Sequence, residues 1–116
     1  MSKPPVINRN TDFRRIYWRG KSVAHPVLVT YATKGRASVT RVGITSGKKI
    51  GNAVTRNRAR RVIRAAYQLV FPEIVGNWDI VFVARSKTPY TKSTQIQSVM
   101  QEQLKKLGVI KENPQQ

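Results

Sequence analysis

The sequence predicts an α+β fold, a two-layer sandwich in which about four strands form one sheet and three helices accompany it. Three segments place apolar residues at helical spacing, and shorter runs rich in β-branched residues lie between them. A chain of 116 residues suffices for one hydrophobic core and is too short for two. We therefore expect a flexible arm at residues 1–8, a single domain at 9–110, and a flexible tail at 111–116.

The first helix is expected between a cap at Asn10 or Thr11 and a stop at Gly20. Its apolar face consists of three residues at spacings of three and four, namely Phe13, Ile16 and Tyr17. On spacing alone, these residues are predicted to pack in the core. Trp18 lies off that face, where it could pack at the rim of the core or stack on a base.

Two strands are expected after this helix. The first runs from about Val27 to Thr33, and one of its two faces is expected to be less deeply buried. Tyr31 in this strand suits ordinary sheet packing and an exposed platform equally well. The second strand lies in SVTRVGITS, after a turn at Gly35, and we expect the two strands to form an antiparallel hairpin.

The longest helix is predicted to begin at Asn52 or Thr55 and to end near Phe71. With about 100° between successive residues, its apolar residues cluster on one arc that comprises Ala59, Val62, Ile63, Ala66, Leu69 and Val70, with Tyr67 at the border. The opposite side is polar and basic and comprises Asn57, Arg60, Arg61, Arg64 and Gln68. Arg58 lies near the other margin of the apolar arc, so both a partner contact and a supporting role in the fold stay open for it.

The segment DIVFVA is almost continuously apolar, as expected for a central strand that is covered on both faces. With the preceding strand and the long helix, it predicts a β-α-β unit whose two strands are parallel. The last helix is expected to be capped by Thr91, Ser93 or Thr94 and to close at Gly108.

The chain has a formal net charge of +17, and no acidic residue occurs between Asp12 and Glu73. This excess predicts a polyanionic partner, in the first place nucleic acid, and otherwise an anionic membrane surface or an acidic protein. Cysteine is absent and His25 is the single histidine, which excludes thiolate sites and histidine clusters for metals. Neither a membrane-span run nor a signal-peptide pattern is present, so a cytoplasmic protein is expected.

Catalysis by the protein itself is not expected. The five acidic residues are scattered, and no pair has the spacing of a general acid and base or of a two-metal site. The loop GKKIGN lacks the spacing of a nucleotide-hydrolysing phosphate loop, although its glycines, lysines and the helix start behind it could bind a phosphate backbone. The basic face of the long helix is the stronger feature, because arginine side chains match phosphate oxygens and therefore predict RNA or DNA contact.

The segment KKIGNAVTRNRARRVIR closely resembles the signature of the bacterial ribonuclease P protein subunit. The hallmark of that family is an RNR triplet, here Arg56, Asn57 and Arg58, followed by further basic positions. The resemblance continues in DFRRIY, SVA, RVGIT and DIVFVAR and covers roughly residues 9–107. It implies a ribosomal-protein-like fold with a left-handed β-α-β crossover, which general handedness rules would not have predicted.

The resemblance further implies a protein that assists a catalytic RNA in removing the 5′ leader of precursor tRNA. The RNA uses magnesium for this cleavage, and no cofactor, small-molecule substrate or membrane is implied for the protein alone. The residues that match positions facing the catalytic RNA are Lys48, Lys49, Arg56, Asn57, Arg58, Arg60, Arg61 and Arg64. The residues that match the aromatic cleft for the leader are Phe13, Tyr17 and Tyr31, while Ile16 stays in the core.

The leader assignment replaces the core prediction for Phe13 and Tyr17. Tyr17 departs from the family, in which phenylalanine is common at that position, but a phenol ring can also stack on a base. The alternative function is a non-catalytic structural protein of another ribonucleoprotein, such as the ribosome, that uses the same basic helix on a different RNA.

Overall fold

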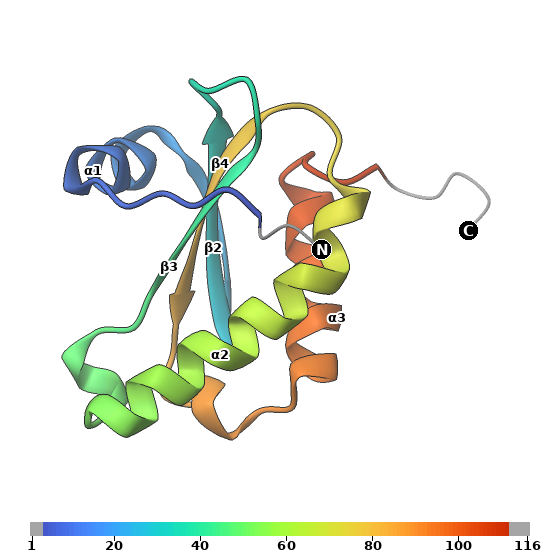
Figure 1. The fold of residues 1–116 in the computed structure, drawn as a ribbon. Helices are drawn as coiled ribbons and strands as arrows, with labels where there is room; N and C mark the ends of the chain where they lie inside the picture. The colour runs from blue at the N-terminus through green and yellow to red at the C-terminus, as the bar shows by residue number, and fades with distance from the viewer. Residues whose placement is uncertain (1–3, 112–116) are drawn as a thin grey trace.

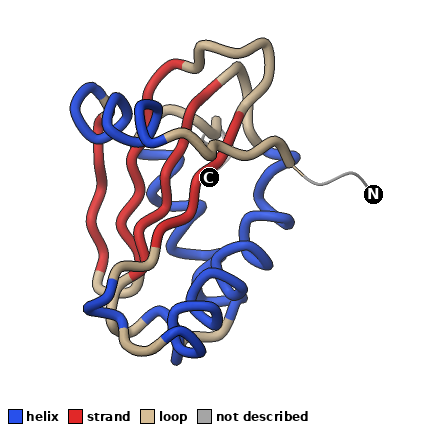
Figure 2. The backbone as a smooth tube through the Cα atoms, turned by 60° about the vertical axis from the view of Figure 1, so that its left-hand side comes forward, coloured by secondary structure: helices blue, strands red, loops and turns tan. Residues whose placement is uncertain are grey.

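The computed structural model describes residues 4–111. Its elements are, in chain order, α1 (Asn10–Arg19), β1 (Lys21–His25), β2 (Leu28–Lys34), β3 (Arg41–Thr45), η1 (Lys48–Ile50), α2 (Ala53–Val70), η2 (Phe71–Glu73), β4 (Trp78–Ala84), η3 (Thr88–Tyr90) and α3 (Ser93–Lys106). In Figure 1, α2 and α3 lie together on one side of the sheet and α1 lies at its other side, and Figure 2 shows the four strands as one layer. Three helices and a four-stranded mixed sheet confirm the predicted α+β class.

The larger core lies between the sheet and the two helices α2 and α3. Its buried residues include Leu28, Ile63, Val70, Ile80, Phe82, Ile96, Met100 and Leu104. A second, smaller cluster lies on the opposite face, where Ile16 of α1 packs with Ile7 and Val81. Leu28 and Ala32 of β2 are buried whereas Val29 and Tyr31 are half-buried, which confirms that one face of this strand is less deeply covered.

The strand order is β1-β2-β4-β3, so β4 lies between β2 and β3. The expected antiparallel hairpin of β2 with β3 is therefore wrong, because β2 pairs antiparallel with β4 and β3 pairs parallel with β4. The physical reason is the composition of β4, which is almost continuously apolar and has a core cluster on each face, as suits the centre of a sheet. The β3-α2-β4 unit with parallel strands is confirmed.

The segment before β2 also differs from expectation. Lys21–His25 forms a separate strand, β1, and Pro26 and Val27 make a two-residue turn into β2 with His25 opposite Leu28. The strand expected from about Val27 to Thr33 is confirmed as β2 with a shift of one residue, since Val27 itself lies in this turn. Strand β1 escaped prediction because it is an edge strand with mostly exposed side chains, so its sequence shows no clear apolar alternation.

The helix ends are partly as predicted. The Asn52 side chain caps α2, since its Oδ1 accepts a hydrogen bond of 2.9 Å from the backbone of Thr55. Arg9 and Lys92 occupy the capping positions of α1 and α3 without side-chain hydrogen bonds, so the caps expected at the N-termini of these two helices are wrong.

Glycines end α1 and α3 for different reasons. Gly108 closes α3 with a φ of 79°, a left-handed conformation that suits glycine. Gly20 ends α1 in an extended conformation, and a Cβ at Gly20 would lie 2.5 Å from the carbonyl oxygen of Ile16. Both predicted stops are confirmed.

The apolar stripe of α2 is rotated relative to the expected arc. Tyr67, expected at its border, is buried, and its ring packs against Phe82 with a centroid distance of 5.4 Å. Leu69, expected in the core, is 59% exposed. The rotation could not be predicted from helical spacing, because Tyr67 and Phe82 come from different elements and their contact is made only in the folded chain.

Part of the expected N-terminal arm is held against the sheet. Val42 of β3 accepts a hydrogen bond of 2.8 Å from the Ile7 amide and donates one of 3.0 Å to the Pro5 carbonyl. Ile7 is buried, and Val6 pairs with Val42 as a parallel bridge. Residues 5–7 therefore extend the edge of the sheet, while 1–3 and 112–116, the ends of the expected arm and tail, lie outside the described residues.

Candidate nucleic-acid interface

The three aromatic residues expected at a leader cleft lie together on the face of the sheet that α1 partly covers. Phe13 and Tyr17 come from α1 and Tyr31 comes from β2. The ring centroids of Tyr17 and Tyr31 are 5.0 Å apart in an edge-on arrangement, and those of Phe13 and Tyr17 are 6.4 Å apart. Tyr17 is 40% exposed, whereas Phe13 and Tyr31 are half-buried. We call these three residues the aromatic row.

A glycine in β3 makes room for the aromatic row. Val81 at the centre of the sheet pairs with Tyr31 on one side and with Gly43 on the other, so all three belong to the same face. A Cβ at Gly43 would lie 2.6 Å from a ring atom of Phe13. Phe13 therefore rests directly on the backbone of β3, and the Tyr17 hydroxyl lies 3.4 Å from the hydroxyl oxygen of Thr45 further along the same strand.

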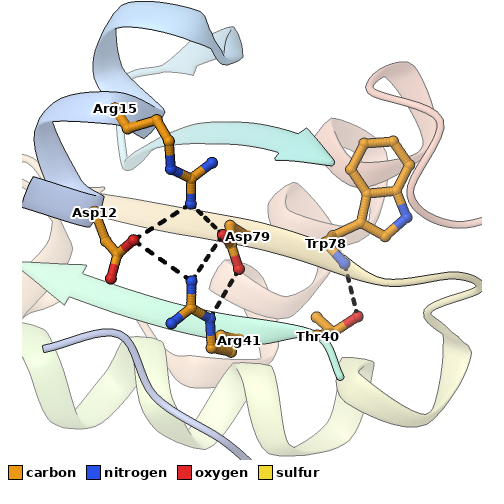
Figure 3. Close-up of polar contacts among 6 residues, drawn as sticks. All are labelled: Asp12, Arg15, Thr40, Arg41, Trp78 and Asp79. Atoms are coloured by element: carbon orange, nitrogen blue, oxygen red, sulfur yellow. Dashed lines mark hydrogen bonds and ion pairs between the residues drawn. The ribbon is translucent and has the colours of Figure 1, made fainter. Parts of the chain in front are cut away.

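A buried polar cluster fixes α1, and with it Phe13 and Tyr17, to the sheet (Figure 3). The carboxylate of Asp79 in β4 is fully buried, and it accepts hydrogen bonds of 3.0 and 2.9 Å from Nε and Nη2 of Arg41 in β3. Arg15 of α1 donates a further hydrogen bond to the same carboxylate. Asp12 completes the cluster at 3.5 Å from Arg15 and 3.6 Å from Arg41.

The electrostatics of this cluster favour the charged forms of Asp79 and Arg41. Burial of the Asp79 carboxylate acts to raise its pKa, but the hydrogen bonds and charges of Arg41 and Arg15 together outweigh that effect, so the pKa of Asp79 is lowered. The hydrogen bond to Asp79 raises the pKa of Arg41. This cluster was not predicted from the sequence. The signal for it was Asp79, the single acid at the start of the apolar segment DIVFVA, because a carboxylate buried in a strand requires hydrogen-bonding partners.

Some basic residues of α2 line a cavity and others lie outside it. Arg60 and Arg64 line a cavity of about 240 Å³ whose other walls include Val6 of the N-terminal segment and Ile44 of β3. Arg61 and Arg58 are exposed and do not line this cavity, and Arg56 is partly buried. Arg58 lies about 160° around the helix from Arg60, so the two cannot face the same part of a ligand.

The arginines of α2 have no carboxylate partners in the part of the chain that the structure describes. Every ion pair found among residues 4–111 belongs to the cluster of Asp12, Arg15, Arg41 and Asp79. Arg60 donates a hydrogen bond to the amide oxygen of Asn57, which orders two polar residues of this face. The positive charge of α2 is thus available to an external anion.

The two lysines before α2 are exposed on the short helix η1. Gly51 then turns the chain with a φ of 138°, a value that favours glycine, and Asn52 caps α2. Lys48 and Lys49 therefore stand beside the N-terminus of α2, where backbone amides and the helix dipole also favour anions. We call these two lysines, Asn57 and the basic side chains of α2 the basic face, which extends around a wide arc of the helix with Arg58 directed away from Arg60.

The aromatic row and the basic face meet along β3. Gly43 lies under Phe13 and also lines the cavity that contains Arg60 and Arg64. The arrangement can hold an unpaired nucleic-acid strand on aromatic rings on one side of β3 and phosphates on the other. No cluster of three or more metal-ligating side chains occurs among residues 4–111, and none of the helices described there is long and apolar enough to cross a membrane.

Comparisons with known proteins show which family the chain is similar to. The family model described as Ribonuclease P matches residues 1–108. The ribonuclease P protein component of Clostridium botulinum (strain Loch Maree) is 38% identical over 108 residues, which are 92% of this chain and 97% of that protein. The corresponding protein of Clostridium novyi is 40% identical over 111 residues, 94% of this chain and 98% of the relative.

Solved structures give the same result. The Staphylococcus aureus RNase P protein superposes with a TM-score of 0.79 at 36% identity and covers 93% of this chain and 99% of its own. The RNase P protein from Thermotoga maritima has a TM-score of 0.73 and covers 84% of this chain and 92% of its own; at 24% identity it supports the fold alone.

Proposed function

The chain belongs to the ribonuclease P protein family, the protein subunits of a tRNA-processing endoribonuclease, and from this premise we propose how its two surfaces divide the work. The basic face binds the catalytic RNA, and the aromatic row binds the 5′ leader of precursor tRNA. The observation that carries the proposal is that both surfaces meet along β3, so one strand of the sheet connects the RNA subunit with its substrate.

Charge supports the assignment of the basic face. The side chains of Arg61 and Arg64 are exposed on a helix whose arginines have no carboxylate partner among the described residues. Each phosphate that such a residue neutralises releases condensed counterions, so binding weakens as salt rises. A folded RNA of high charge density matches a surface that combines a basic helix with lysines at its N-terminus.

Geometry supports the assignment of the aromatic row. Rings at centroid distances of 5.0 and 6.4 Å lie on a face of the sheet where one of them, Tyr17, is 40% exposed. Stacking on aromatic rings accepts any base, which suits leaders of variable sequence. In this proposal the RNA subunit performs the cleavage with its magnesium ions, and the protein holds the leader and reduces phosphate repulsion.

The test is reconstitution of the chain with the catalytic RNA at low magnesium. Precursor tRNA with a leader and mature tRNA without one are compared for affinity, and cleavage of the precursor is followed. Phe13→Ala is expected to weaken binding of the precursor by about 1 to 3 kcal/mol and to leave mature tRNA unaffected. Tyr90→Ala, which removes an exposed aromatic ring from η3, is the matched control.

The basic face is tested in the same system. Arg61→Ala is expected to weaken binding of the catalytic RNA and to lower the salt slope by about one counterion. Lys106→Ala removes the same charge from an exposed position at the end of α3 and serves as the control. Unchanged precursor affinity and cleavage on adding the chain, or recovery from cells of ribosomal RNA without the ribonuclease P RNA, would refute the proposed function.

A further inference from the structure

Trp18 is the most exposed large apolar side chain in the described part of the molecule, with 88% of its surface accessible. It lies on the outer side of α1, since Ile16 on the inner side of the same helix is fully buried and a separation of two residues turns the helix by about 200°. The other tryptophan differs sharply. Trp78 packs against the core and donates a hydrogen bond of 2.8 Å from Nε1 to the carbonyl of Val75.

The surroundings of Trp18 are cationic. Arg14 precedes it by one helical turn on the same side of α1 and is exposed. Asp12 is the only acid in α1, and it is directed toward Arg15 and Arg41 at the sheet. An apolar ring beside a free guanidinium, with no carboxylate on that side of the helix, has the charge and shape that suit a nucleotide.

Trp18 also continues the aromatic row around α1. Successive helical residues differ by about 100°, so Trp18 lies about 100° around the helix from Tyr17. Arg14 lies between them when the helix is viewed along its axis. Tyr17 is itself in ring contact with Tyr31 on the sheet. A strand that crosses Tyr31 and Tyr17 and continues over the outer side of α1 reaches Arg14 and then Trp18.

We infer that Trp18 and Arg14 form an additional binding site for one unpaired nucleotide of the leader, further from the sheet than the nucleotides held by the aromatic row. The indole stacks on the base and the guanidinium of Arg14 contacts the adjoining phosphate. This inference rests on the proposed function of the aromatic row. A protein partner fits less well, because a stable protein interface needs about 800 Å² per partner and the helical neighbours of Trp18 on this side, Thr11 and Arg14, are polar.

Fluorescence provides a direct measurement. The chain has two tryptophans and four tyrosines, so Trp78→Phe leaves Trp18 as the only tryptophan, which is excited selectively at wavelengths beyond the tyrosine absorption band. This variant is assembled with the catalytic RNA and titrated with precursor tRNAs whose leaders lengthen one nucleotide at a time. We expect Trp18 emission to be quenched once the leader exceeds a threshold length, and mature tRNA to leave it unchanged.

Affinity measurements in the assembled holoenzyme give the second readout. Trp18→Ala is expected to weaken binding about five- to tenfold for leaders beyond the threshold, and to leave shorter leaders and mature tRNA unaffected. Arg14→Ala should act over the same range of lengths, and Trp18→Phe should retain part of the affinity because it keeps an aromatic ring. Trp18 is so exposed that these variants are expected to fold normally, which circular dichroism verifies.

The outcomes separate this inference from the proposed function. A leader-dependent loss in Phe13→Ala with no loss at any length in Trp18→Ala would overturn the Trp18 site and keep the aromatic row. An equal loss for every leader length and for mature tRNA in Trp18→Ala would also overturn it, because Trp18 would then contact another part of the complex. Absence of any leader dependence in both variants would refute the proposed function itself.

Discussion

Replacement of Asp79 by asparagine is expected to destabilise the whole domain and to misplace its aromatic row. The variant removes a fully buried carboxylate that accepts three hydrogen bonds from Arg41 and Arg15. The side chains of these arginines are only 22% and 10% exposed, so their charges would lose their partner in a place that water barely reaches. Breaking a buried ion pair from one side costs about 3 to 5 kcal/mol, against a total of about 5 to 15 kcal/mol for a domain.

The assay is urea denaturation followed by circular dichroism, with Glu102→Gln as the control for an exposed acid on α3. The pKa of Asp79 is lowered in the folded state, so its ionised carboxylate contributes to the free energy of unfolding. This contribution is fully present above the pKa of about 3.9 of an unfolded aspartate, and it is lost as the pH falls through the lower pKa of the folded state. The free-energy difference between wild type and Asp79→Asn should therefore shrink in acid. A difference that stays constant with pH, or an Asp79→Asn variant as stable as Glu102→Gln, would refute the reasoning.

Three further changes follow from the packing. Tyr67→Phe removes a buried hydroxyl that has no hydrogen-bond partner among the described residues, so it should stabilise the domain by about 1 kcal/mol. In the wild type, burial raises the pKa of Tyr67, so absorbance at high pH should show a tyrosine that ionises above the ordinary tyrosine range, and stability should be lost as it ionises. Gly43→Ala places a methyl group against Phe13 and should cost about 1 to 3 kcal/mol and weaken leader binding, whereas equal leader affinity would contradict the geometry. Gln103→Leu leaves Thr30 Oγ1 and the carbonyls of Val23 and Leu28 without this partner, and thermal unfolding should show a loss of about 3 kcal/mol or more.

Local features of the fold were predictable because their causes are local. The Asn52 cap depends on residues three apart, and the alternating burial of β2 depends on the strand period. The position of β4 between β2 and β3 was not predictable in this way, because it joins segments that are separated by a whole helix. Strand β1 was not predicted because it is an exposed edge strand, and such a strand needs no apolar pattern in its sequence.

In the candidate site, too, local features were predictable and those that need distant segments were not. The face of α2 that bears Arg60, Arg61 and Arg64 follows from helical spacing, but the placement of Arg60 and Arg64 in a cavity requires the N-terminal segment and β3. Spacing alone assigned Phe13 and Tyr17 to the core; only the family resemblance moved them to a cleft. In the structure Phe13 is half-buried over Gly43 and packs against the smaller core cluster, whereas Tyr17 is 40% exposed, so the leader role of both residues stays a prediction.

The strand order also has a consequence for the time course of folding. Strand β2 can pair early with β1, but β2 and β3 are joined into one sheet only by β4, which follows the complete helix α2. Pairings between such distant segments form slowly because the loop must close before any contact stabilises it. During synthesis, the arginine-rich helix therefore emerges before the central strand against which it packs, and the nascent chain carries most of its positive charge ahead of a finished sheet.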